Sequence, residues 1–179
     1  MSPLDALKNF ARRHSLKGRE KDPSLTGIEP FSEIKTVSVF FDADIPGAPQ
    51  TIAKIQDYFK QRGKTVFIYA LTLGAQIFSE GMQKATFIHR EDINWFGKIK
   101  NRKRRQGIDA GEDLFVSLFA ENNFPVEYAA RCSKARFKAG RFQLPGYTYD
   151  LVISDPQERH LSQNQAFDAI MDFIGKIEY

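Results

Sequence analysis

Two short apolar segments with a helical pattern between them constrain the fold more than any other feature of the sequence. Residues 34–41 (I-K-T-V-S-V-F-F) and 65–71 (T-V-F-I-Y-A-L) are rich in β-branched and aromatic residues, which is typical of strands. The second segment is almost continuously apolar, as expected for a sheet that is covered on both faces. Between them, Ile52, Ile55 and Phe59 recur at helical spacing. This order predicts a βαβ unit.

The rest of the chain continues the alternation of strands and helices. Further strands are expected over 85–89, 113–119, 134–138 and 149–154, and further helices over 122–132 and 162–177. Such alternation indicates a mostly parallel sheet with helices on both faces. We therefore expect an α/β protein: a three-layer α/β/α, Rossmann-like domain with five or six strands.

The N-terminal segment is expected to lie outside this domain. A short basic amphipathic helix begins near Pro3, and the polar residues 17–24 follow it as a linker. We therefore assign residues 1–23 to a helix and linker, and residues 24–179 to a single domain. The single cysteine, Cys132, fits a reducing compartment, and no stretch approaches the ~18 apolar residues of a membrane span. These features predict a cytoplasmic protein.

The sequence lacks the motifs of the common cofactor sites. No G-x-G-x-x-G follows the first strand, and no Walker A lysine motif occurs anywhere in the chain. The three histidines are scattered, and one cysteine cannot build a zinc site. We expect no cofactor.

Carboxylates follow three of the expected strands, at the edge where parallel sheets bind ligands. Asp42 and Asp44 follow the first strand, Glu121 follows the strand over 113–119, and Asp155 follows the last. An apolar strand and then D-x-D resembles the first motif of the haloacid dehalogenase-like phosphatases. The resemblance implies that Asp42 is a phosphoryl-accepting nucleophile and Asp44 a general acid. It also implies that Thr72 binds phosphate, that Lys134 holds the charge, and that Asp42 and Asp155 bind Mg²⁺.

The chain departs from that phosphatase pattern in two places. Pro46 stands two residues after the second Asp, where the family usually has Thr or Val, and Asp155 stands alone where the family has paired acids. The alternative interpretation is that Asp42 and Asp44 shape a turn or cap a helix, as Asp often does.

Charge is distributed unevenly along the chain. Residues 1–23, 98–105 and 131–141 together carry 17 of the 26 basic residues and 3 of the 22 acidic ones. The remaining residues carry 9 basic and 19 acidic side chains, although the net charge of the whole chain is only +4. A protein with segregated positive charge attracts polyanions more strongly than its net charge suggests.

Two of these segments are candidate polyanion-binding surfaces. Alternation in K-A-R-F-K predicts that its three cations share one face of a strand, and the aromatic pair Trp95 and Phe96 precedes the basic run. The pair could stack on bases, although we expect at least one of them to fill the core. The candidate residues are Lys98, Lys100, Arg102, Lys103, Arg104, Arg105, Lys134, Arg136 and Lys138.

Several segments in combination resemble a family of short bacterial proteins with no assigned function. They are D-I-N-W-F-G-K (92–98), C-S-K-A-R-F-K-A-G (132–140), the strand that ends at Asp42, and Y-D-L-V-I (149–153). The resemblance implies a small cytoplasmic α/β domain and no particular activity. Residues 113–140 also faintly resemble the acceptor half of heptosyltransferase-type glycosyltransferases, but 179 residues leave no room for their second domain.

Three functions remain open from the sequence. The first is a non-enzymatic module whose basic face contacts a polyanion, RNA or a ribonucleoprotein being the expected one. The second is a Mg²⁺-dependent phosphatase-like or nucleotide-binding enzyme that uses Asp42 and Asp44. The third is a scaffold whose basic face meets an acidic protein partner.

Overall fold

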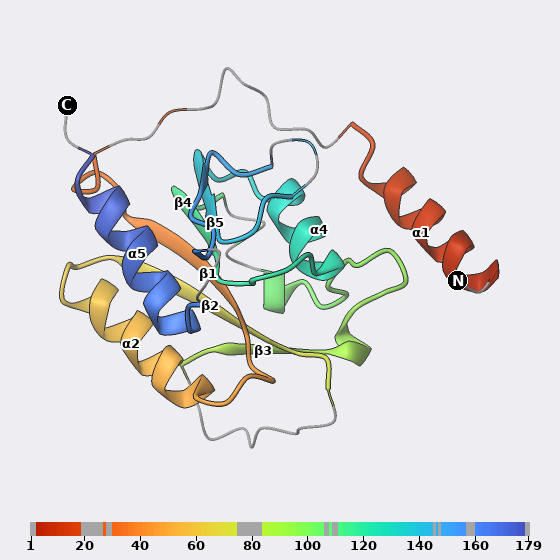
Figure 1. Cartoon of the computed structure of the whole chain (residues 1–179), viewed down its shortest axis with the longest axis horizontal. Coiled ribbons are helices and arrows are strands. Elements are labelled where there is room, and N and C mark those ends of the chain that lie inside the picture. The colour runs from red at the N-terminus through yellow and green to blue at the C-terminus, as the bar shows by residue number, and fades with distance from the viewer. Residues whose placement is uncertain are drawn as a thin grey trace.

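The computed structural model describes residues 3–18, 27, 30–74, 84–105, 108, 111–144, 146, 148–156 and 160–177. Within them, six parallel strands form one sheet with the order β3-β2-β1-β4-β5-β6, and helices cover both faces (Figure 1). The elements along the chain are α1 (Pro3–Ser15), β1 (Thr36–Asp42), α2 (Ala48–Lys60), β2 (Thr65–Thr72), β3 (Thr86–His89), the 3₁₀ turns η2 (Arg90–Asp92) and η3 (Lys103–Arg105), β4 (Leu114–Ser117), α4 (Phe124–Cys132), β5 (Phe137–Gly140), β6 (Leu151–Val152) and α5 (Gln163–Gly175). The predicted α/β fold is confirmed.

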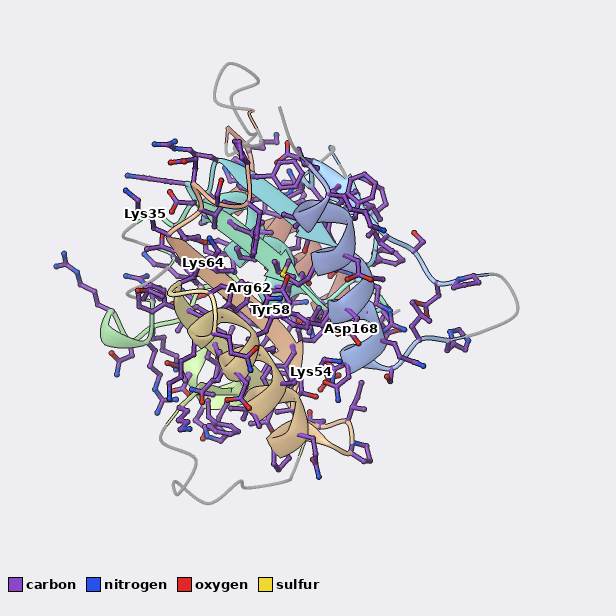
Figure 2. The ribbon with its side chains drawn as sticks, turned by 90° about the vertical axis from the view of Figure 1, so that its left-hand side faces the viewer. Lys35, Lys54, Tyr58, Arg62, Lys64 and Asp168 are labelled. Carbon is purple, nitrogen blue, oxygen red and sulfur yellow. The ribbon has the colours of Figure 1, made fainter. Side chains whose placement is uncertain are left out.

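Helices α2 and α5 lie side by side on one face of the sheet (Figures 1 and 2). Their apolar faces, which include Phe59 and Phe167, pack against Val39 and the other residues of β1 that point to this side. At the surface, the Lys54 Nζ atom lies 2.5 Å from an Asp168 carboxylate oxygen and links the two helices (Figure 2). The side chains that recur at helical spacing in this segment, Ile52, Ile55 and Phe59, are therefore buried, as predicted.

The other face of the sheet is covered by α4 and by the segment that joins β3 to β4. Phe40, Tyr69 and Phe115 stack on this face, with ring centroids 4.5 and 5.0 Å apart in the two pairs that share Phe40. Ile99 and Ile108 of the connecting segment join the same buried cluster. The basic run therefore belongs to a segment whose apolar residues are anchored in the core.

The predicted strand over 134–138 begins three residues too early and ends two residues too early. The strand begins at Phe137 and ends at Gly140, and it pairs with β4 on one side and β6 on the other. The Tyr149 ring packs against Gly140, where the nearest ring carbon lies only 2.4 Å from the position of a Cβ atom. Because a side chain has no space there, this end of the strand requires glycine.

Helix α1 lies at the periphery of the molecule, well away from α2 and α5 (Figure 1). The linker expected over 17–24 lies largely outside the described residues. None of the helices in the described part of the chain is long and apolar enough to cross a bilayer.

Candidate functional site

A cavity of about 500 Å³ opens where the carboxyl ends of β1, β4, β5 and β6 meet. The strand order reverses between β1 and β4, which is where open α/β sheets commonly bind ligands. Asp42, Glu121 and Asp155 line this cavity, which we call the carboxylate crevice. Asp42 and Asp155, which were predicted to lie at the carboxyl ends of two strands, both line this cavity.

Asp44 organises the neighbouring loop. Its carboxylate accepts hydrogen bonds from the Thr72 hydroxyl at 2.7 Å and from the backbone N–H groups of Leu73 and Gly74 at 2.8 Å each. Burial alone would raise the pKa of Asp44, but these hydrogen bonds lower it below its usual value. The Asp44 carboxylate is therefore ionised, and its hydrogen bonds hold the loop after β2. The Thr72 hydroxyl is used in one of these hydrogen bonds.

Asp42 and Asp155 have opposite electrostatic environments in the crevice. Burial raises the pKa of Asp42, and the charges of Asp44 and Glu121 raise it further, against a hydrogen bond from the Asp44 backbone. The hydrogen bonds and charge of Arg141 lower the pKa of Asp155. Two Arg141 nitrogens donate to the two Asp155 oxygens at 2.6 Å each, so a guanidinium already neutralises this carboxylate.

The structure separates Lys134 from the other residues of the phosphatase hypothesis. Lys134 precedes β5 and so lies at the amino edge of the sheet, away from Asp42 at the carboxyl edge. Within the described residues, no group of three or more His, Cys, Asp or Glu side chains is placed to hold a metal ion. Of the three carboxylates in the crevice, Asp155 is already paired with Arg141.

A second cavity, of about 520 Å³, lies between α1, the residues after β3 and the start of α4. Its cations are Lys8, Arg12 and Arg90, and we call it the cationic groove. No carboxylate is among the described residues that line it, while Trp95 and three asparagines are. The groove therefore combines positive charge, neutral hydrogen-bonding groups and an aromatic ring.

A tight turn over 94–98 fixes the aromatic wall of the groove. The Asn94 side-chain oxygen accepts hydrogen bonds from the N–H groups of Phe96 and Lys98 at 3.0 and 2.9 Å. Gly97 adopts a φ of 78°, and the Phe124 ring fills the space that a Cβ atom would need. Trp95 is 52% exposed and Phe96 45% exposed, so the expectation that one of them fills the core is wrong.

Helix α1 closes the groove through its basic side chains. The Lys8 Nζ atom lies 5.9 Å from the centroid of the Trp95 ring, and the Arg12 guanidinium lies 4.8 Å from that of Phe124. Leu16, just after the helix, is buried, whereas Leu7 and Phe10 are exposed. The helix therefore contacts the domain with its cations and turns part of its apolar face outward.

The predicted basic run divides into exposed and paired cations. Lys98, Lys100 and Arg102 are exposed, and an antiparallel bridge between Ile93 and Ile99 sets their backbone alongside the residues that line the groove. Arg104 instead forms an ion pair with Asp92 and donates to the Phe87 carbonyl, while Arg105 is partly buried. The side chain of Lys103 lies outside the described part of the structure.

The second predicted basic segment lies at the opposite edge of the sheet. Lys134 and Arg136 are exposed, but they precede β5 at its amino end, whereas Lys98 and Lys100 follow β3 at its carboxyl end. Lys134 and Arg136 therefore lie apart from Lys98 and Lys100 along the strand direction, whereas Arg105, at the end of the first segment, lines a cavity with Cys132, two residues before Lys134.

The prediction that Lys138 lies on an exposed strand face is wrong. Its side chain is 2% exposed, and the Nζ atom donates to the carbonyls of Ala130 at 2.6 Å and Ser133 at 2.8 Å. The alternation failed because β5 lies between two strands and has both faces covered, so neither face of the strand is open to solvent. This ammonium satisfies the carbonyls at the end of α4.

Sequence reasoning missed the groove, although it noted the basic helix. Arg90 directly follows β3, but the pattern of this short strand was too weak to indicate a candidate residue at its carboxyl end. The usable signal was the same one that located Asp42 and Asp155, which is that polar residues after parallel strands converge at one edge.

Comparisons with known proteins place the chain in a family. Searches of curated proteins and of solved structures found no match. A model for a family of unknown function matches residues 8–168, which begin within α1, end within α5 and include the residues that line both cavities. The chain therefore belongs to this family of unknown function, DUF6913.

Proposed function

We propose that this protein is a non-enzymatic binding module whose cationic groove contacts a polyanion, namely RNA or a ribonucleoprotein. The observation that carries the proposal is the meeting of Lys8, Arg12 and Arg90 at one cavity without a carboxylate among its described lining residues. These cations come from segments that are far apart in the sequence, so only the fold brings them together.

The electrostatics of the groove favour an anionic ligand. None of Lys8, Arg12 and Arg90 forms an ion pair with a carboxylate among the described residues. Three cations at one cavity repel each other and focus a positive potential outward. Phosphate groups relieve this repulsion and release their own counterions, which is the main source of affinity in nucleic-acid binding.

Exposed cations next to the groove extend the surface. Lys98, Lys100 and Arg102 follow the turn that carries Trp95, and all three are exposed. A flexible polyanion that enters the groove can therefore continue along this segment. A single small anion would need only the groove, so the extension favours a polymer.

The carboxylate crevice supports the enzymatic alternative less well. Asp44 and Thr72 bond to each other, and Arg141 holds Asp155, so three of the residues required by phosphatase chemistry already have structural partners. The scaffold alternative shares the groove with the leading proposal and differs only in the partner, which would be an acidic protein.

Binding over a salt series tests the proposal. We expect single-stranded RNA to bind the full chain with an affinity that falls linearly with log salt, and with a shallower slope in Lys8→Glu/Arg90→Glu. The matched control is Lys35→Glu/Lys60→Glu, which changes the same charge at exposed lysines away from the groove. Absence of binding at about 50 mM salt would overturn the proposal, and co-purification with an acidic protein would then favour the scaffold.

A further inference from the structure

Trp95 presents an exposed indole from a tightly held backbone turn. The turn that carries it is fixed by Asn94 and by the left-handed Gly97. Trp95 is the only tryptophan in the chain, and half of its surface is open to solvent at the wall of the groove. An exposed aromatic ring on a held turn, next to cations, is the arrangement with which proteins stack unpaired nucleic-acid bases.

Cations lie close enough to the ring to serve the same nucleotide. Lys8 Nζ is 5.9 Å from the centroid of Trp95, and Arg12 lies against Phe124 on the same groove. A base on the indole therefore carries its phosphate toward Lys8 and Arg12. Sequence-independent single-strand binders use this combination of an aromatic platform and a positive channel.

Two polar atoms of the groove residues lack a hydrogen-bond partner within the described part of the chain. They are Arg12 Nε, a donor, and Asn123 Oδ1, an acceptor. A buried polar atom without a partner costs free energy, so such atoms often mark a missing ligand or water. A phosphate oxygen suits the first atom, and a base amino group or ribose hydroxyl suits the second.

We propose that the cationic groove takes a single-stranded RNA segment, with one base stacked on Trp95 and the adjoining phosphates at Lys8, Arg12 and Arg90. This inference rests on the proposed polyanion-binding function. In duplex RNA the bases are already paired and stacked, so they are not free to cover the indole. The groove therefore discriminates for unpaired strands through Trp95, while its cations accept any polyanion.

Intrinsic fluorescence of the full chain tests this directly, because Trp95 is the only tryptophan. The probes are an oligouridylate, a duplex RNA of the same length, inorganic polyphosphate and anionic phosphatidylglycerol vesicles. We expect the oligouridylate to quench the emission strongly and the duplex to quench it little. Polyphosphate should bind through the cations without quenching, because it has no bases.

Anisotropy of a dye-labelled oligouridylate measures the variants, which lack tryptophan. Trp95→Ala should bind the oligouridylate roughly 5- to 150-fold more weakly, the range typical of one lost stacked base, and Trp95→Phe should retain most of the affinity. The affinity for polyphosphate should be unchanged in both variants. Phe173→Ala is the matched control, because Phe173 on α5 is 51% exposed and Trp95 is 52% exposed.

The outcomes separate this inference from the proposed function. If RNA and polyphosphate bind equally, without quenching and without an effect of Trp95→Ala, the stacking inference is wrong and the polyanion function stands. If none of the anionic polymers binds at low salt, both are wrong. A blue shift with the vesicles but no response to the oligouridylate would overturn both in favour of a membrane surface.

Discussion

Lys138 and Glu112 share Ser133 as a hydrogen-bond partner in the interior of the protein. The Lys138 ammonium donates to the Ser133 carbonyl at 2.8 Å, and a Glu112 carboxylate oxygen accepts from the Ser133 hydroxyl at 2.9 Å. Both charged residues are 2% exposed. Burial raises the pKa of Glu112, although the hydrogen bonds and the charge of Lys138 oppose the shift. The network ties the end of α4 to the segments that lead into β4 and β5.

Replacement of Lys138 should destabilise the fold without a direct effect on binding. Lys138→Met keeps most of the apolar stem but leaves the carbonyls of Ala130 and Ser133 without their donor. We expect a loss of about 2–4 kcal/mol in the free energy of unfolding, measured with urea. Lys134→Met is the control, because this exposed lysine should change stability by less than about 0.5 kcal/mol. Equal effects of the two variants would contradict the assigned role of Lys138.

The sequence predicted those features that follow from a local pattern. The βαβ unit was readable because apolar residues recur at strand and helix periods, and the meeting of Asp42 and Asp155 was readable because parallel strands end at one edge. The role of Lys138 was not readable, since its partners are carbonyls of α4 that only the tertiary structure brings close. The groove was hidden for the same reason, because the packing of Lys8 on Trp95 depends on how α1 docks.

The Arg141–Asp155 pair should make stability depend on acid pH. The folded-state pKa of Asp155 lies below its usual value of 3.8, chiefly because Arg141 donates hydrogen bonds to it. The contribution of Asp155 to the free energy of unfolding is therefore fully present above about pH 4, and it is lost as the pH falls through the lowered pKa. We expect Asp155→Asn to cost about 2–4 kcal/mol at neutral pH, because the Arg141 side chain, only 4% exposed, loses its carboxylate.

Urea unfolding of both proteins between about pH 2 and pH 7 measures this dependence. The difference between wild type and Asp155→Asn should be largest at neutral pH and should shrink toward zero at the acid end. Asp168→Asn is a suitable control, because the Asp168 carboxylate is largely exposed in its pair with Lys54. A constant difference across the whole pH range would show that Asp155 does not act through its charge.

Asp42 distinguishes the binding module from the enzymatic alternative. Burial raises its folded-state pKa above 3.8, so its ionised form is a cost to the fold that is present above the raised pKa and absent below the usual value. Asp42→Asn removes this charge, and the amide oxygen can still accept from the Asp44 backbone. We expect stability at pH 7 to be unchanged or slightly higher, and RNA affinity to be unchanged.

Magnesium titrations complete the Asp42 test. The binding module predicts that Mg²⁺ leaves the melting temperature of wild type and Asp42→Asn equally unaffected. The phosphatase-like enzyme predicts that Mg²⁺ stabilises the wild type and that the substitution abolishes the effect. Phosphatase assays with a generic phosphomonoester would provide the second readout, and activity lost in Asp42→Asn would favour the enzyme.

Gly97 should be essential to the turn that presents Trp95. Its φ of 78° is unfavourable for alanine, and the nearest atom of the Phe124 ring lies 2.4 Å from the position of an added Cβ atom. Gly97→Ala therefore combines backbone strain with a clash, for a loss of about 2–4 kcal/mol in the free energy of unfolding. Because the turn must shift, the emission maximum of Trp95 and the affinity for the oligouridylate should change as well.

Gly63→Ala separates the two causes of that loss. Gly63 also has a positive φ, of 66°, but an added Cβ atom there meets nothing within 4 Å. This control should lose only about 1–2 kcal/mol from backbone strain and should leave both Trp95 emission and RNA affinity unchanged. If Gly97→Ala behaved like Gly63→Ala in all three measurements, Phe124 would not constrain the turn. The aromatic wall of the groove would then lack the rigidity on which stacking at Trp95 depends.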